Sequence, residues 1–467
     1  MAAANDTRLK VSRLAPLAVA SALFMDFIDS TALSTALPTL SRAFHSDPIH
    51  LKLCLTSYIL TLAVMTPASG WVADRFGAKR VFLCAMAVFL AGSLACACSR
   101  SLSQLVAARI LQGLGGAMMT PVGRLIVVGS APRERLVSAM ASFTMPALLG
   151  PMIGPPLAGL VLSVADWPWI FLINLPVGLA GMVAVFFLAP ELPKAEVAKF
   201  DLLGFGLAAA AIIALEVVAE TLGVGLAPPK VMIGLFLLGV LGLFLFVRHV
   251  LASDTPILNL RLLTRPTYRA SLLGGGLMRL SLGAWPFLMP LLLQIGMGWS
   301  PAKAGLVSMA QAAGAFAAKY VSTQMVRTLG FKRLLVSCGA LTAIGTTAPA
   351  FFRSDTPALA IAVLLAAIGF MRSNFFTGVN TVAFAELQGR DVNPGATLSS
   401  VVQQLTIGLG VSFGALMLHV GRGNHSNLAP GQFLIPFLAI GVAALLAIPV
   451  FARLPADAGD DISREAI

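Results

Sequence analysis

The sequence predicts an all-α polytopic membrane protein, and three observations lead to that prediction. The 467 residues are 58% hydrophobic and only 11% charged, and their mean hydropathy is +0.88, which is far above that of ordinary soluble domains. The apolar residues come in repeated runs of about 20 residues, long enough for a helix to cross a bilayer core. These runs are continuous rather than alternating, so helices are favoured over a β-barrel.

Fourteen apolar stretches are bounded by Gly, Pro or charged residues, and each is predicted to be a transmembrane helix. They cover residues 14–38, 50–72, 81–98, 103–129, 137–163, 168–189, 202–222, 231–250, 268–294, 303–326, 333–352, 357–384, 396–420 and 432–452.

The distribution of Lys and Arg indicates the orientation of these helices. An even number of spans places both termini on one side of the membrane. If that side is the cytoplasm, 20 of the 32 basic residues fall in cytoplasmic segments and seven on the opposite side. Topology therefore explains the net charge of +12, and no basic run is interleaved with aromatic residues as nucleic-acid binding would require.

Two loops indicate an internal repeat. Residues 70–80 read GWVADRFGAKR and residues 323–333 read TQMVRTLGFKR, so that Gly77 aligns with Gly330 and a Lys-Arg pair follows in both. Each loop connects the second and third helices of a six-helix half if spans seven and eight are an insertion. The predicted domains are a six-helix bundle at 1–189, two inserted helices at 190–265 and a second six-helix bundle at 266–467.

Five short stretches in the first half carry polar, Gly or Pro residues. They are IDSTALSTALP at 28–38, GWVADRFGAK at 70–79, RILQGLGGA at 109–117, GPMIGPPLAG at 150–159 and WPWIFLINLPVG at 167–178. In this order they resemble motifs of the major facilitator superfamily, and within it those of the fourteen-helix drug:proton antiporter family (DHA2). The departures from the family patterns are Ser34, Val72, Ala78, Ala158 and Pro168.

The resemblance implies the major facilitator fold, with two six-helix bundles around a central cavity, and proton-coupled efflux by alternating access. It also implies two sets of residues for conformational gating. The loop set is Gly70, Asp74, Arg75, Gly77 and Lys79, and the fifth-helix set is Gly150, Pro151, Gly154, Pro155 and Gly159.

Each gating set has a physical rationale. Asp74 follows a helix and can pair with Arg75 or accept backbone donors of a facing helix, which would latch one conformation; a solvated loop that only sets topology is the alternative. The fifth helix is expected to be kinked and to have a flat face for close packing, because Pro lacks an N–H donor and Gly lacks a side chain.

Asp26, Asp29 and Arg109 are the predicted proton-coupling residues. An ionisable residue inside a span indicates function, because burial of its charge must be offset by a partner or by cavity water. Asp26 and Asp29 are three residues apart, so they can face one cavity, and two carboxylates this close do not readily ionise together. Asp29 matches the family motif and is favoured for coupling, while a purely structural pairing with Arg109 is the alternative.

Further basic and polar residues within the spans are predicted to line the substrate cavity: Arg124, Arg279, Lys319, Arg372, Gln311, Asn374, Asn380, Gln403 and Gln404. Few acids are available to pair with these cations, so the cavity is expected to attract anions such as carboxylates or metal-carboxylate chelates. Snorkelling of the cations to an interface and hydrogen bonding of the amides between helices are the alternatives.

Several signals of other functions are weak or missing. The sequence contains no G-K-[ST], which argues against ATP-driven pumping. The GVSFG at 410–414 lies in an apolar span without a preceding strand, so it is not interpreted as a hydrolase elbow. No enzyme activity, cofactor or metal site is predicted.

The favoured function is a proton-coupled multidrug or small-molecule efflux antiporter in the plasma (inner) membrane, monomeric and with both termini cytoplasmic. Its predicted partners are a small-molecule substrate, protons and the lipid bilayer. An exporter of organic anions is the first alternative, and a non-transporting membrane sensor or scaffold is the second.

Overall fold

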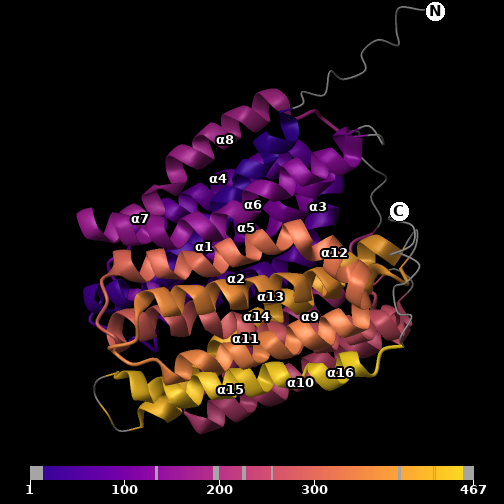
Figure 1. Ribbon diagram of the computed structural model, residues 1–467. Helices are drawn as coiled ribbons and strands as arrows, with labels where there is room; N and C mark the ends of the chain where they lie inside the picture. The colour runs from indigo at the N-terminus through magenta and orange to yellow at the C-terminus, as the bar shows by residue number, and fades with distance from the viewer. Residues whose placement is uncertain are drawn as a thin grey trace, which may run out of the picture.

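The computed structural model describes residues 14–131, 135–192, 199–222, 228–253, 256–387, 391–423, 425 and 428–455. These described residues form helices and no strand (Figure 1). Thirteen of the helical segments are long and apolar enough to cross a membrane. The longest, Pro301–Phe351, holds the two predicted spans at 303–326 and 333–352, because the chain leaves helical geometry at Gly330, with φ 70° and ψ 162°. The predicted all-α membrane fold is confirmed.

The helices keep the order predicted from the sequence. The first group is α1 (Ala15–Ala43), α2 (Lys52–Met65), α3 (Ser69–Phe76), α4 (Ala78–Ala97), α5 (Leu102–Ser130), α6 (Leu136–Val164), α7 (Trp169–Leu172) and α8 (Asn174–Leu188). Two helices follow, α9 (Leu202–Thr221) and α10 (Pro229–Ala252). The last group is α11 (Pro266–Leu291), α12 (Pro301–Thr347), α13 (Ala358–Phe384), α14 (Val392–Arg422), α15 (Leu434–Leu445) and α16 (Ile448–Ala452).

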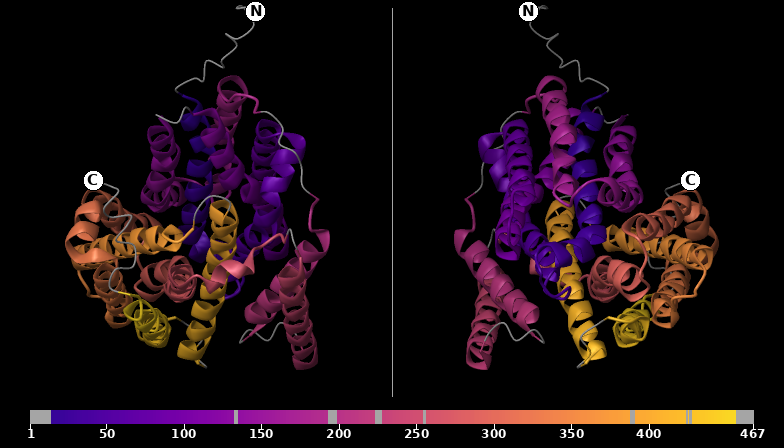
Figure 2. Two further views of the ribbon diagram at one scale, coloured as in Figure 1. Left: turned by 90° about the vertical axis from the view of Figure 1, so that its right-hand side faces the viewer. Right: turned by 90° about the vertical axis from the view of Figure 1, so that its left-hand side faces the viewer.

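Viewed along the helices, the first group lies on one side and the last group on the other (Figure 2). Helices α9 and α10 stand together at the edge, where α9 packs against α2 of the first group and α14 of the last. The three-part division at 1–189, 190–265 and 266–467 stays a prediction, and its outermost residues, 1–13 and 456–467, lie outside the described residues.

The two ends of the bundle are built differently. We call the end where α1 begins and α16 ends the terminal end, and the opposite end the distal end (Figure 1). At the distal end one hydrophobic cluster joins both groups, with Leu37 and Leu51 packed together with Trp285 and Leu418. Toward the terminal end, separate clusters serve the first group and α11–α16. The groups therefore share a core at the distal end only.

Polar contacts add to the closure of the distal end. The Gln294 side-chain amide donates to the Thr35 carbonyl oxygen at 2.8 Å. The guanidinium of Arg422, the last residue of α14, lies 2.5 Å from the carboxylate of Asp47, which follows α1. Both contacts join the first group to the last, so the distal end is held by hydrogen bonds and an ion pair as well as by apolar packing.

Candidate functional site

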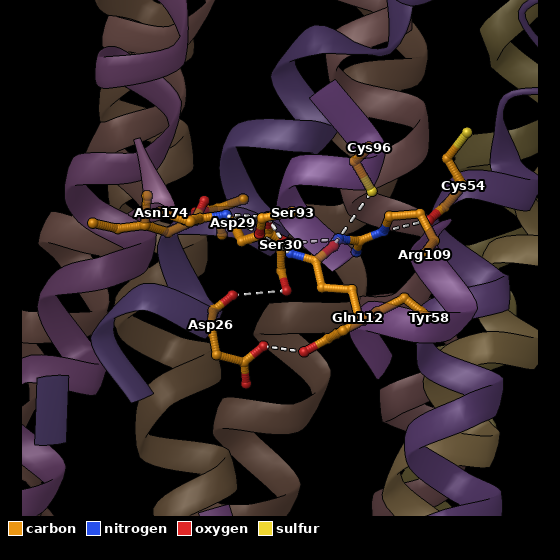
Figure 3. A network of polar contacts seen from close by, with 12 residues as sticks. Asp26, Asp29, Ser30, Cys54, Tyr58, Ser93, Cys96, Arg109, Gln112 and Asn174 are labelled. Carbon is orange, nitrogen blue, oxygen red and sulfur yellow. Dashed lines mark hydrogen bonds and ion pairs between the residues drawn. The ribbon is translucent and has the colours of Figure 1, made fainter. Parts of the chain in front are cut away.

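Asp29 lies at the centre of a buried polar network (Figure 3). Its side chain on α1 is 0% exposed. Its Oδ2 lies 2.5 Å from Nη1 of Arg109 on α5, while Oδ1 accepts hydrogen bonds from Gln112 at 2.9 Å and Asn174 at 2.6 Å. A buried carboxylate with one cation and two amide donors is both neutralised and fully hydrogen-bonded. This arrangement holds the Asp29 side chain in one position against α5 and α8.

Arg109 is also held in place by several contacts. It is 1% exposed, its Nε donates to the Cys54 carbonyl oxygen at 3.0 Å, and its guanidinium carbon lies 4.2 Å from the ring centroid of Tyr58. The Gly-rich motif after Arg109 explains how α5 comes this close to α2, since a Cβ at Gly113 would lie 2.7 Å from the Cβ of Thr61. The motif therefore positions the arginine through backbone packing.

Asp26, one turn earlier on α1, has a different environment. Its Oδ1 accepts a hydrogen bond from the Tyr58 hydroxyl, and Figure 3 shows its carboxylate pointing away from the cluster around Asp29. It is only half-buried and makes no ion pair within the described part of the chain. Asp26 can therefore gain or lose a proton without leaving a buried cation unpaired.

A cavity of about 370 Å³ lies between α1, α6, α11, α12 and α13. Among the predicted cavity residues, the structure brings four to its lining: Gln311, Lys319, Arg372 and Asn380. Much of the remaining lining is apolar or aromatic, including Phe27, Trp285, Pro286, Met289, Phe316 and Phe376. An apolar wall with a few placed polar groups is typical of a small-molecule site.

The charged groups of this cavity are all cationic. Lys319 donates to the Thr377 hydroxyl at 2.9 Å, and neither Lys319 nor Arg372 makes an ion pair with a described residue. Arg279 lies behind the wall and donates to Asn380 at 3.1 Å. None of the described residues that line the cavity carries a carboxylate, so the electrostatic potential of this lining favours anionic groups.

Four other predicted cavity residues lie elsewhere. Arg124 is exposed on α5, and Gln403 is exposed on α14; neither lines this cavity. Asn374 is 0% exposed. Its amide oxygen accepts a hydrogen bond from the Ser322 hydroxyl at 2.8 Å, and its amide nitrogen donates to the Phe370 carbonyl at 3.0 Å. Asn374 thus makes the helix-to-helix contact that the sequence left open as the alternative. Gln404, half-buried on α14, is also outside the lining.

The loop motif adopts the backbone its glycines permit. Gly77 ends α3 with φ 94°, and its counterpart in the repeat, Gly330, has φ 70°, a region that side-chain-bearing residues avoid. The expected pairing of Asp74 with Arg75 is not made: among described residues Asp74 has no ion pair, and Arg75 lies 5.7 Å from the ring centroid of Trp71. The role of this loop as a conformational latch stays a prediction.

The other members of that loop set lie close by at the terminal end. Gly70 is exposed with open space around it, and the Lys79 ammonium lies 5.6 Å from the Phe186 ring centroid. Among the described residues, neither Gly70 nor Lys79 makes a hydrogen bond, ion pair or ring contact with the last group of helices. No hydrophobic cluster of described residues joins the two groups at this end.

The Gly and Pro residues of α6 lie where three helices meet. A Cβ at Gly150 would lie 2.6 Å from the Cβ of Phe27 on α1, and one at Gly159 would lie 2.5 Å from the Pro301 carbonyl oxygen at the start of α12. Gly154 faces Thr31 of α1 in the same way. The two prolines of the motif, Pro151 and Pro155, line the cavity.

Sequence reasoning missed several members of the network: Tyr58, Ser93 and Asn174. Asn174 is part of the stretch at 167–178 that matched the family pattern, so a signal for it existed. Tyr58 and Ser93 carry no such signal, because their helices read as ordinary apolar spans. Among the described residues, no group of three or more His, Cys, Asp or Glu side chains could hold a metal ion.

Comparisons with known proteins agree with this fold. The family model described as Major Facilitator Superfamily matches residues 19–264. A Pectobacterium carotovorum protein named "Putative multidrug resistance protein MdtD" is 36% identical over 446 residues, covering 94% of this chain and 95% of that protein. An Escherichia coli protein of the same name is 36% identical over 454 residues, covering 95% of each.

Solved structures resemble the chain in fold at low sequence identity. A D-xylose-proton symporter matches with a TM-score of 0.68 at 13% identity, covering 96% of this chain and 98% of that one. A bacterial homolog of the human lysosomal transporter Spinster, inward-facing and unoccupied, matches with a TM-score of 0.66 at 14% identity, covering 96% of each.

Proposed function

Since the chain belongs to the major facilitator superfamily, we propose that it is a proton-coupled exporter of small molecules that works by alternating access. The observation that carries this proposal is the shared core at the distal end alone, with a cavity between the two groups of helices. Rocking of the groups about the cavity would open the distal end and close the terminal end. The relatives named as multidrug resistance proteins support export as the direction.

In this proposal Asp26 exchanges the proton and the pair of Asp29 with Arg109 is a fixed structural centre. This reverses the preference for Asp29 that the family motif suggests. The reason is geometric: Asp29 is saturated by one cation and two amides, whereas Asp26 holds a single hydrogen bond from Tyr58. Tyr58 contacts both Asp26 and Arg109, so it joins the exchanging group to the fixed one.

The proposed setting is the inner membrane, with the terminal end in the cytoplasm. The excess of Lys and Arg in the segments of that side supports this orientation, although Arg8, Lys10 and Arg13, which contribute to it, lie outside the described residues. With this orientation the cavity of the present conformation would load from the cytoplasm, as an exporter requires.

A transport assay tests the proposal. Ligands are first found by a thermal-shift screen of purified protein against citrate, metal-citrate chelates and ethidium, because a ligand that binds the folded state raises its unfolding temperature. Proteoliposomes with an imposed pH gradient should then accumulate a hit, and the gradient should be consumed as they do so. Equal accumulation with and without the imposed pH gradient would contradict proton coupling.

The cations of the cavity favour a second candidate, export of organic anions. Lys319 and Arg372 face the cavity without acidic partners in the described part of the chain, so a carboxylate or chelated carboxylate would supply the missing counter-charge. Arg372→Gln should weaken citrate binding by roughly tenfold or more, as loss of a charge-assisted bond implies. The matched control is Arg124→Gln, which removes an exposed arginine outside the cavity. Equal affinities in both variants would exclude an anion site at Arg372.

A non-transporting sensor or scaffold is the candidate of another class. It predicts partner binding without flux of any tested solute, and the same proteoliposome assay separates it from export. We expect no catalysis, no cofactor and no nucleic-acid binding, and we expect a monomer, which light scattering of the purified protein would check.

A further inference from the structure

A second group of ionisable side chains lies inside the membrane-spanning region, away from Asp26 and Asp29. Lys52 at the start of α2 is 0% exposed, and Glu216 and Glu220 of α9 are 4% and 7% exposed. The Lys52 ammonium lies 3.3 Å from Glu220 Oε2. Glu220 Oε1 accepts a hydrogen bond from the Ser412 hydroxyl of α14 at 2.6 Å. Glu220 therefore connects α9 to both groups of helices.

Glu216 lies one turn before Glu220 and has no such partner. Its Oε1 is shielded from solvent and accepts no hydrogen bond from any described residue. The carboxylate points at α14, where a Cβ at Gly408 would lie 2.9 Å from Oε1 and would displace the carboxylate from its present position. The same Gly408 position faces Ile59 of α2. Glu216 is thus enclosed between α2 and α14.

The charges of this cluster do not balance. It holds two carboxylates and one ammonium, which gives one net negative charge if all three are ionised. The other basic residues of the packed helices are exposed, lie in distant turns or have another partner. Lys230 at the start of α10 and His419 near the end of α14 are exposed, Arg248 and His249 lie in the last turns of α10, and Arg422 pairs with Asp47. An uncompensated buried charge is costly, and one bound proton removes it.

We propose that Lys52, Glu216 and Glu220 form a second proton-binding site, with the proton on Glu216. The site is separate from Asp26 and belongs to the two helices between the six-helix groups. Its proton is sealed by the packing of α2 against α14, which is part of the distal closure. Parting of these two helices would expose Glu216 to water from the distal side, so release of this proton would accompany opening of that end.

Infrared spectroscopy of the purified full-length protein tests the proposal without any transported ligand. A protonated carboxyl group gives a C=O stretching band that a carboxylate lacks. The wild-type protein should show a band from a buried carboxyl at neutral pH. The Glu216→Gln variant should lose the amplitude of one group, while Glu191→Gln, which changes an exposed carboxylate, should lose none. Asp26→Asn should retain the Glu216 component.

Lys52→Met provides an independent check. Without the ammonium, Glu220 loses its compensating charge and should also become protonated, so the band should gain the amplitude of one group. Gln has the shape of protonated Glu, so Glu216→Gln should fold, which its thermal unfolding curve verifies. An unchanged band in folded Glu216→Gln, or no band in the wild type at neutral pH, would overturn the proposal. Neither result depends on whether the protein exports anything.

Discussion

Asp26 and Asp29 lie three positions apart on one helix, and we propose different roles for them. Asp29 is buried and paired with Arg109, and it contributes to holding α1, α5 and α8 together. Asp26 faces Tyr58 and is partly buried. A group that must exchange protons needs access to water and freedom to change charge, which is why we assign the exchange to Asp26 rather than to Asp29.

Asp29→Asn should destabilise the fold by about 3–5 kcal/mol, because it leaves the Arg109 guanidinium buried without its counter-charge. Arg109→Gln should cost a similar amount by leaving the carboxylate alone. The double variant should cost clearly less than the sum of the two, since it leaves no unpaired charge. Chemical unfolding of the purified variants measures all three values. Additive losses would show that the two groups do not stabilise each other.

The sequence revealed the ionisable residues of the site but not their partners. Asp26, Asp29 and Arg109 stand out because charge is rare inside apolar spans. Tyr58 and Ser93 do not stand out, since such residues are common in membrane helices. Which side chain meets which also depends on the rotation and crossing of separate helices, and a single sequence does not specify these. The saturation of Asp29 could not be predicted for this reason.

Helix α6 is the element that joins the two groups most closely in the middle of the bundle. Its glycines let it approach α1 on one side and the start of α12 on the other, and its prolines face the cavity. The flat face was predictable from the Gly and Pro residues at 150–159. That this face packs against α12 was not predictable, because small residues indicate close packing without specifying the neighbouring helix.

Gly159→Val should open the distal end, because the added side chain would press on the Pro301 backbone of the other group. The matched control is Gly234→Val on α10, where a Cβ meets nothing within 4 Å. The readout is labelling of a cysteine introduced at Ala304, which is 2% exposed in the distal core. Its reaction with a membrane-impermeant maleimide should be several-fold faster with Gly159→Val and unchanged with Gly234→Val.

This labelling needs a clean background and has a clear contrary outcome. The exposed native cysteines, Cys84 and Cys98, are first changed to Ser. Equal labelling rates with valine at 159 and at 234 would mean that α6 tolerates the added volume and that its glycines do not set the distal closure.

The ion pair of Asp47 with Arg422 should stabilise the closed distal end over a wide pH range. Burial of Asp47 opposes ionisation, but hydrogen bonds from Arg422 and from the Ile49 N–H, with the Arg422 charge, leave the Asp47 pKa below its ordinary value. The contribution of the ion pair to stability is therefore complete at pH values above the ordinary pKa range of aspartate, and it is lost as the pH falls through the lowered pKa of Asp47.

Asp47→Asn should lower the unfolding temperature by a constant small amount between about pH 5 and pH 8, since such partly exposed pairs contribute about 1 kcal/mol or less. The difference from wild type should shrink only below the ordinary aspartate range, as the pH falls through the lowered Asp47 pKa and the wild-type carboxyl also becomes protonated. Thermal unfolding across pH measures it. A difference that changes between pH 6 and pH 8 would instead make Asp47 a candidate for the coupling proton.

The described helices form two groups, α1–α8 and α11–α16, that share a hydrophobic core at one end. The repeat predicted from Gly77 and Gly330 agrees with the backbone, since both residues have positive φ at corresponding turns. The number and order of the spans were also predictable, because each is a long apolar run. The conformation of the bundle was not predictable, since its open and closed forms use the same helices and differ only in the orientation of the two groups relative to each other.

The direct test of proton-coupled export through Asp26 is ligand-driven proton movement in proteoliposomes, followed with an enclosed pH-sensitive dye. A ligand found by the thermal-shift screen is added to vesicles that contain wild-type protein or Asp26→Asn. We expect wild-type vesicles to show a ligand-dependent pH change, and Asp26→Asn vesicles to show none although the variant still folds and is still stabilised by the ligand. An equal pH change with Asp26→Asn would contradict the assignment of the exchanged proton to Asp26.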